Sequence, residues 1–144
     1  MSLPSPRRGL VVRHAFVWSH EKAAGTDEAR KDRPCVIVLM MASDESGQVR
    51  GGVVPITHRP PTDPDGGIEV PTSVRRQLGL DDARQWVIYD ELNRFVWPGY
   101  DLRPVPGQAG SYAYGMLPQD LYDRIVRGVL ARNRARKLSV LDRD

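Results

Sequence analysis

The chain has few of the residues that build disulfides and zinc sites. Its 144 residues include one cysteine, Cys35, and three histidines, at positions 14, 20 and 58. A single cysteine cannot form an intrachain disulfide, and its place in an apolar run favours a buried thiol over a nucleophile. Ligands this few and this widely spaced argue against a zinc site. We therefore expect no metal and no other cofactor.

Long apolar segments are also absent. The longest apolar run, residues 35–42, is far shorter than the ~18 residues that a membrane span requires. The first ten residues carry basic side chains, but they do not lead into the apolar core of a secretory signal. We expect a cytoplasmic protein that does not associate with a membrane.

Several common catalytic motifs are missing as well. No Gly-rich loop ends in Lys-Ser/Thr, and there is no nucleophile-elbow pattern. His20-Glu21 lacks the second histidine of a zinc-protease helix, because alanine stands at position 24. The segment 63–67, DPDGG, is interrupted by proline and favours a turn over a calcium loop. These absences weaken the usual ATP-hydrolysing, metal-dependent and acyl-transfer interpretations.

What the chain does contain is a series of short segments with the composition of β-strands. They are rich in β-branched and aromatic residues, and turn-forming residues separate them. The predicted strands are 9–18, 31–40, 49–58, 86–97 with a bend in its middle, 112–117, and a short one near residue 68. Pro55 inside the third of these strands indicates an edge, a bulge or a bend.

Two segments have helical periodicity. Between residues 118 and 137, Leu121, Ile125 and Val129 recur every four residues, which predicts an amphipathic C-terminal helix. A shorter helix is predicted at 71–79, with its C-cap at a glycine.

The strands and helices together predict one mainly β (α+β) domain over residues 1–144. It would be a small barrel over about 8–117 that carries a C-terminal helix over about 118–137, with loop and helical insertions. The net charge of +3 is uneven, since residues 121–144 hold seven Lys and Arg against three Asp. Such a basic cluster favours an anionic partner, or it complements the dipole at the helix end.

Two features at predicted strand ends suggest a functional site. Arg33-Pro34 opens one strand, and Thr57-His58 closes the next. If these strands are adjacent in a barrel, Arg33 and Thr57 meet at one rim. An arginine and a hydroxyl both donate hydrogen bonds, and the guanidinium keeps its charge, so the pair would suit a phosphate. The alternative is that the arginine only begins a strand and the threonine only caps backbone groups.

Six segments follow one another along the chain in a recognisable order. They are RRGLVVRHAFVW, a loop with Gly25 and Glu28, KDRPCVIV, VVPIT, VIYDELNR with Glu91 and Arg94, and YGMLPQDLYDRIVRGVL. In this order they resemble the PemK/MazF family of toxins from bacterial toxin–antitoxin pairs, and the resemblance covers most of residues 8–131.

This resemblance implies a small SH3-like barrel, a homodimer and a metal-independent endoribonuclease that cleaves single-stranded RNA. The family's catalytic arginine and threonine fall on Arg33 and Thr57. Its members are held inactive by a cognate antitoxin protein, which is therefore an expected partner. In such a reaction the RNA 2′-hydroxyl attacks the adjacent phosphate, and fixed donors stabilise the charge that develops on the phosphate oxygens.

The remaining site residues have weaker sequence support. Glu28 matches a loop acid of the family, and His58 titrates in the range of a general acid or base, although strand alternation would turn it away from Thr57. Arg94 and Tyr100 are the candidates for binding RNA, Tyr100 by stacking on a base.

The chain also departs from the family. Some members have an aspartate shortly after the residue matched by Arg94, whereas here Phe-Val-Trp follows. Glu91 is expected to serve as a structural partner for a neighbour such as Arg94. A catalytically silent barrel that binds RNA or a protein partner through the same surface is therefore the alternative to the nuclease.

Overall fold

The computed structural model describes residues 7–19, 31–41, 48–97, 102–107 and 111–142. In these residues the chain forms more strand than helix, with eight strands and two α-helices, which confirms the predicted mainly β (α+β) class. The strands are β1 (Leu10–Phe16), β2 (Lys31–Met41), β3 (Val49–Thr57), β4 (Gly67–Glu69), β5 (Trp86–Ile88), β6 (Glu91–Trp97), β7 (Ala113–Met116) and β8 (Ser139–Asp142). A 3₁₀ turn, η1 (Pro64–Gly66), precedes β4, and the helices are α2 (Thr72–Leu78) and α3 (Gln119–Arg134).

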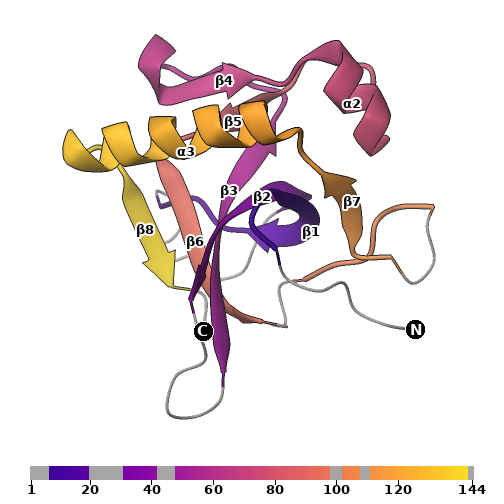
Figure 1. Ribbon diagram of the computed structural model, residues 1–144, viewed down its shortest axis with the longest axis horizontal. Helices are drawn as coiled ribbons and strands as arrows, with labels where there is room; N and C mark the ends of the chain where they lie inside the picture. The colour runs from indigo at the N-terminus through magenta and orange to yellow at the C-terminus, as the bar shows by residue number, and fades with distance from the viewer. Residues whose placement is uncertain (1–6, 20–30, 42–47, 98–101, 108–110, 143–144) are drawn as a thin grey trace.

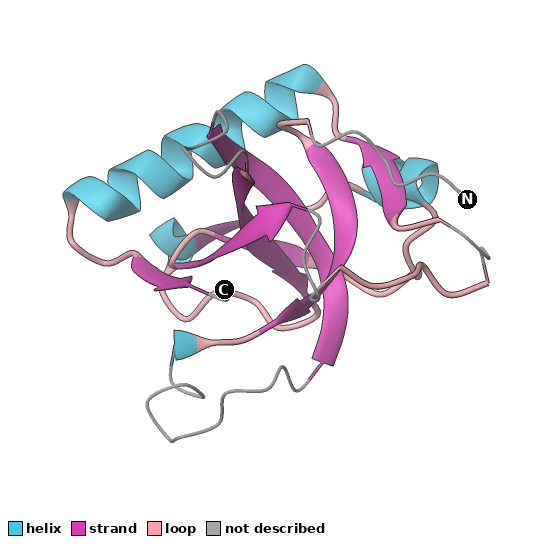
Figure 2. Ribbon diagram, turned by 90° about the horizontal axis from the view of Figure 1, so that it is seen from below, coloured by secondary structure: helices cyan, strands magenta, loops and turns pink. Residues whose placement is uncertain are grey.

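The strands form one curled sheet (Figures 1 and 2). Its main path runs β4-β5-β3-β2-β1-β7, with antiparallel neighbours throughout. On the side away from β2, β3 pairs with β6 over Val49–Val53 and with β5 at Ile56 and Thr57. This change of partner along one strand accompanies the curl of the sheet into a half-barrel.

Strand β1, the middle of β2 and most of β3 are buried on both faces, which explains why these segments are continuous apolar runs and not alternating ones. In β1, Val11 packs in a cluster that includes both helices, whereas the adjacent Val12 packs in the interior of the curl. In β2, Val36 and Cys35 divide between the two clusters in the same way. The strands next to the candidate site are therefore fixed from both sides.

Helix α3 lies across one face of the sheet, as Figure 1 shows, and it begins and ends within the predicted range. Its buried residues are Leu121, Ile125, Val129 and Arg132. The shorter helix α2 is also present where predicted, and Gly79 caps it with a left-handed φ of 70°. The sequence periodicity predicted both helices correctly.

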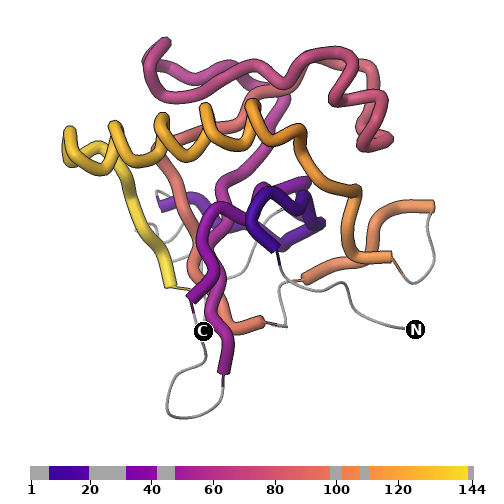
Figure 3. The backbone as a smooth tube through the Cα atoms, in the orientation of Figure 1, coloured from indigo at the N-terminus to yellow at the C-terminus, as the bar shows by residue number. Residues whose placement is uncertain are grey.

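Two strand predictions needed revision. The predicted strand 86–97 is two strands, β5 and β6, separated at Tyr89 and Asp90, so its expected bend is a break. Strand β8 was missed: after α3 the chain returns beside β6 and pairs with it in parallel, from Glu91 opposite Ser139 to Arg94 opposite Asp142 (Figure 3). The basic C-terminal segment is thus partly a strand of the sheet.

The two strand prolines lie where a missing N–H is tolerated. Pro55 falls between the β6-paired and β5-paired parts of β3, at the point where the strand changes partner on one side. Pro34 of β2 lies opposite Arg13 of β1. The backbone N–H of Arg13 donates to the Tyr112 carbonyl, and the Arg13 carbonyl accepts from the Arg103 N–H. Both of these Arg13 groups therefore point away from β2. The Pro34 nitrogen therefore faces β3, and the β2–β3 ladder extends only to Cys35 opposite Pro55.

Candidate functional site

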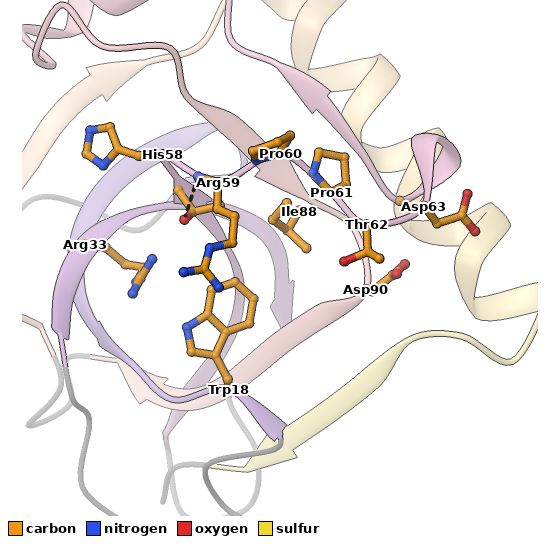
Figure 4. Close-up of a pocket in the computed structure, with 12 residues that line it drawn as sticks. Trp18, Arg33, His58, Arg59, Pro60, Pro61, Thr62, Asp63, Ile88 and Asp90 are labelled. Carbon is orange, nitrogen blue, oxygen red and sulfur yellow. Dashed lines mark hydrogen bonds between the residues drawn. The ribbon is translucent and has the colours of Figure 1, made fainter.

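An open pocket lies where β2 and β3 separate (Figure 4). It has a volume of about 890 Å³. Arg33 and Thr57 both line it, although they are 24 residues apart in the sequence (57 minus 33). The other lining residues are Trp18, His58, Arg59, Pro60, Pro61, Thr62, Asp63, Gly66, Ile88 and Asp90.

The strand register brings the first two residues together. Cys35 pairs with Pro55, so the same antiparallel register places Arg33 across from Thr57, two residues further on each strand. Because Pro34 ends the ladder, the two side chains border an opening and not a continuous sheet. This is the physical reason that a strand entered through Arg-Pro can hold an arginine at a rim.

Trp18 positions the Arg33 side chain. The guanidinium carbon of Arg33 lies 5.3 Å from the centre of the Trp18 ring, within the range of a cation–π contact. The backbone on both sides of Trp18 is clamped by β6. The buried Asn93 side chain accepts from the Val17 N–H at 3.0 Å and donates to the Val17 carbonyl at 2.9 Å. Glu91 accepts from the Ser19 N–H at 2.6 Å and from its hydroxyl at 2.8 Å.

The partner expected for Glu91 was therefore wrong. Glu91 is structural, but it binds Ser19 and not Arg94. Arg94 makes a two-pronged ion pair with Asp142 of β8, at 2.6 and 2.9 Å. This contact raises the pKa of Arg94 and lowers that of Asp142 through the hydrogen bonds between them. Arg94 lies opposite Gly52 on β3 and does not line the pocket, so the structure does not bring it together with Arg33 and Thr57.

The Thr57 hydroxyl retains its donor capacity. Its oxygen accepts the N–H of Arg59 at 3.4 Å, the contact drawn as a dashed line in Figure 4. A hydroxyl has one donor and two acceptor positions, so this contact leaves the O–H available to a ligand. Arg59 itself is exposed and adds a second guanidinium to the pocket lining.

His58 lines the same pocket as Arg33 and Thr57. Strand β3 ends at Thr57 and the chain bends at His58, so strand alternation does not fix the direction of this side chain. The His58 Nε2 lies 2.8 Å from Asp81 Oδ2, and Asp81 Oδ1 accepts from the Ala83 N–H at 3.0 Å and from Gln85 Nε2 at 3.1 Å.

A smaller cavity of about 270 Å³ adjoins this arrangement. It shares Arg33 and His58 with the main pocket. Its lining also includes Arg13, whose guanidinium donates to the Tyr114 hydroxyl at 2.9 Å. Arg33 and His58 therefore stand between two recesses, one on each side.

The opposite side of the main pocket is acidic. In Figure 4, Arg33 and His58 lie on one side, Thr62, Asp63 and Asp90 on the other, and Arg59 and Trp18 between them.

These two carboxylates are joined by Arg132 of α3. Arg132 donates to Asp90 at 2.6 and 3.0 Å and to Asp63 at 3.0 Å. The N–H of Asp65 and then Arg132 hold the pKa of Asp63 below its ordinary value of 3.8, and hydrogen bonding to Asp90 raises the pKa of Arg132.

Two predicted site residues, Glu28 and Tyr100, lie outside the described residues. Conversely, the sequence analysis did not single out Trp18, Asp63 or Asp90 for the site. Trp18 carried a weak signal, because it is an aromatic residue placed where an apolar strand gives way to a polar loop. Asp63 and Asp90 carried no such signal in the sequence, because their place in the site depends on the packing of α3 beside η1.

Other reactive groups are accounted for in the described part of the chain. Cys35 is fully buried, and burial raises the pKa of its thiol, so it stays neutral as predicted for a core residue. Within residues 7–19, 31–41, 48–97, 102–107 and 111–142, no group of three or more His, Cys, Asp or Glu is arranged to hold a metal ion. Neither α2 nor α3, nor any other described helix, has the length and apolar character of a membrane span.

Comparisons of the chain with models of protein families, with curated proteins and with solved structures found no match. Its function must therefore be inferred from the site alone. The fold and pocket define a mainly β protein with a cationic, hydroxyl-bearing rim beside an aromatic ring. Such a rim is suited to a phosphate that carries a flat group next to it.

Proposed function

We propose that the chain is a metal-independent endoribonuclease of the PemK/MazF type, built on an SH3-like barrel. The single observation that carries this proposal is that Arg33 and Thr57, from two strands, line one pocket. The curled, mainly antiparallel sheet with α3 across it supports the barrel.

The reaction is an internal transesterification of single-stranded RNA. The ribose 2′-oxygen attacks phosphorus, its proton leaves to a base, and the bond from phosphorus to the 5′-oxygen breaks as that oxygen gains a proton. The products are a 2′,3′-cyclic phosphate and a 5′-hydroxyl. Arg33 and Thr57 donate to the phosphate oxygens, where negative charge is greatest in the transition state, and Trp18 keeps the guanidinium in place.

His58 is the proton carrier of this mechanism. Asp81 holds its Nε2 at 2.8 Å and so orients the ring, as an acidic partner does in other acid–base pairs. The position of His58 beside Arg33 in the lining of both recesses supports this role. Glu28 remains a second candidate for this role.

The partners proposed with this activity are single-stranded RNA, a second copy of the chain and a cognate antitoxin in the cytoplasm. An antitoxin segment with acidic side chains would occupy the Arg33 side of the pocket and exclude RNA. The open pocket and its two guanidinium groups, Arg33 and Arg59, support this form of inhibition.

The test is cleavage of a mixed-sequence single-stranded RNA in the presence of EDTA. We expect the wild type to cut, and we expect Arg33→Ala and Thr57→Val each to lose about 10²–10³ in rate, the usual cost of one donor to a developing oxyanion. Thr57→Ser, which keeps the hydroxyl, should retain most activity. Arg76→Ala, which removes an exposed arginine from α2 away from the pocket, is the matched charge control. Cleavage that survives both pocket substitutions would place the active site elsewhere.

The second candidate is a catalytically silent barrel that binds RNA or a protein partner. It is favoured by the sequence after Arg94, which lacks the acid found in some nucleases of this type. It is also compatible with the Arg33–Trp18 stack, which can hold a base or a side chain without any reaction. Wild-type protein that binds the RNA and leaves it intact would favour this candidate.

A further inference from the structure

The recess on the other side of Arg33 carries a second arginine. This small recess, the cavity of about 270 Å³ that shares Arg33 and His58 with the main pocket, is also lined by Arg13 and Tyr114. The half-buried Arg13 guanidinium donates to the Tyr114 hydroxyl at 2.9 Å. A guanidinium beside a hydroxyl, the arrangement that Arg33 and Thr57 present to the main pocket, therefore recurs in the small recess.

The Arg13 side chain has no acidic partner among the residues that the structure describes. The Tyr114 hydroxyl is the one hydrogen-bond partner that this guanidinium has there, and it is neutral. An arginine withdrawn from water usually has a counter-ion, because the loss of its hydration is costly. A guanidinium also carries several N–H donors, so one contact leaves most of them to a ligand. Arg13 therefore presents an uncompensated positive charge to the small recess.

The two carboxylates in the lining of the small recess are already engaged. Asp32 lies 3.6 Å from the Nε of Arg103. Asp81 lies 2.8 Å from the Nε2 of His58 and accepts from the Ala83 N–H at 3.0 Å. Neither carboxylate has a printed contact with Arg13, so the charge of Arg13 remains for a ligand.

Arg13 and Arg33 are close to one another. They lie on the neighbouring strands β1 and β2, where Arg13 is opposite Pro34, and paired strands are about 5 Å apart. Burial raises the pKa of the Cys35 thiol, and the charges of Arg33 and then Arg13 oppose this rise, so both guanidinium groups act on one point of the sheet. Anions bound at these two arginines would be neighbours, as successive phosphates of one strand are.

The backbone holds Arg13 in place for such a contact. Its N–H donates to the Tyr112 carbonyl at 3.0 Å, and its carbonyl accepts from the Arg103 N–H at 2.8 Å. The pairing of β1 with β7 shifts register between Val11 and Val12, immediately before Arg13. Such irregularities redirect the side chains beside them. A donor fixed in advance loses little entropy when it binds a ligand.

We infer that Arg13 and Tyr114 form a second phosphate site, which binds the phosphate next along the RNA to the one held by Arg33 and Thr57. This inference rests on the proposed function, because it takes the Arg33 side of the main pocket as the first phosphate site. The Tyr114 oxygen accepts from Arg13, so its O–H is left to donate to the phosphate. A contact of this kind fixes the register of the strand without reading its sequence.

The experiment is calorimetric titration of the wild type, at constant ionic strength, with three uridine nucleotides. They are uridine 3′-monophosphate, uridine 5′-monophosphate and uridine 3′,5′-bisphosphate, and none contains a phosphodiester that could be cleaved. We expect the bisphosphate to bind about tenfold or more tightly than either monophosphate, because charge-assisted hydrogen bonds to a second phosphate are worth at least about one decade of affinity. This comparison does not depend on any variant folding.

Variants then locate the second site. Arg13→Met removes the charge but keeps an unbranched side chain, and it should bring the affinity for the bisphosphate close to that for the monophosphates. Tyr114→Phe removes only the hydroxyl and should reduce the preference in part. Arg76→Met makes the same change of net charge at an exposed residue of α2 that lines neither cavity, and it should leave the preference intact. Arg33→Ala should weaken the binding of all three ligands.

The outcomes separate this inference from the proposed function. Equal affinities of the wild type for the bisphosphate and the monophosphates, all reduced by Arg33→Ala, would overturn the second site and leave the first one standing. A preference that survives Arg13→Met, or that Arg76→Met abolishes equally, would also overturn the second site, because it would then come from elsewhere or from net charge alone. If none of the three nucleotides binds, the phosphate site at Arg33 fails and the second site fails with it.

Discussion

Gly128 of α3 is the position where a common stabilising substitution should do the opposite. In a helix interior, Gly→Ala gains about 1 kcal/mol, because alanine loses less backbone entropy on folding. Here a Cβ on Gly128 would lie 2.6 Å from Cδ2 of Tyr89 and closer still to its Cε2 and Cζ. Tyr89 is 7% exposed and belongs to the same core cluster as Ile125 and Val129. Its ring therefore has little room to move away.

The expected change in stability is the balance between the gain in helix propensity and the cost of the close contact with the Tyr89 ring. Overpacking a filled site costs about 1–3 kcal/mol, or more where the contact is very close, and three ring atoms are overlapped at Gly128. Against the gain of about 1 kcal/mol from helix propensity, we expect Gly128→Ala to lower the free energy of unfolding by about 1–2 kcal/mol. For a chain of 144 residues this corresponds to a fall in Tm of about 3–7 °C.

The measurement is urea denaturation followed by circular dichroism, carried out as a double-mutant cycle with Tyr89→Leu. Removing the ring should reverse the sign of the effect, so that Gly128→Ala stabilises the Tyr89→Leu background by about 1 kcal/mol. A higher free energy of unfolding for Gly128→Ala in the wild-type background would refute the reasoning. It would mean that α3 does not pack against Tyr89 as closely as the structure shows.

Two further predictions concern the surroundings of the pocket. Asn93→Ala should lower the free energy of unfolding by about 2 kcal/mol or more, because it leaves the buried N–H and carbonyl of Val17 without their side-chain partners. Asn133→Ala, on the exposed side of α3, should have little effect, and thermal melting would check both variants. Asp63→Asn should flatten the acid limb of the stability curve. The folded-state pKa of Asp63 is lowered, first by a neighbouring backbone N–H and then by Arg132, so its contribution is present above the ordinary value of 3.8 and is lost as the pH falls toward the lowered one. Urea midpoints between pH 2 and 6 that fall equally in wild type and variant would contradict this assignment.

The helices and the meeting of Arg33 with Thr57 could be predicted because each depends on local patterns. A four-residue apolar repeat is enough to identify α3, and a glycine after α2 is enough to place its C-cap. Likewise, antiparallel strands that follow one another in the sequence commonly pair, which brings the end of one next to the start of the other. These inferences need no knowledge of distant contacts.

Strand β8 and the acidic side of the pocket could not be found in this way. Residues 139–142 have the sequence SVLD, which does not alternate in polarity, and their pairing with β6 is set by how α3 returns the chain across the sheet. Asp63, Asp90 and Arg132 are separated by 27 and 42 residues (90 minus 63 and 132 minus 90), and none stands in a recognisable pattern. Their association is a product of tertiary packing, which composition and periodicity do not encode.

His58 shows a different limit. Alternation correctly assigns opposite faces to neighbouring residues within a strand, as it does for Val11 and Val12. It does not apply to His58 because the strand ends one residue earlier, and strand ends are the least certain part of any sequence-based assignment. The two prolines after Arg59 also force the chain to leave the sheet there, so the signal was present in the sequence.

The Arg33-Pro34 step connects these local and tertiary effects. The nitrogen of Pro34 faces β3 and donates no hydrogen bond, so the ladder stops and a pocket opens beside Arg33. An arginine in an intact ladder would point to one face of a closed sheet, whereas one at the end of a ladder can border a cavity. Its direction is then set by Trp18, which β6 holds through the buried Asn93. A proline thus creates the opening, and a strand distant in sequence aligns the charge within it.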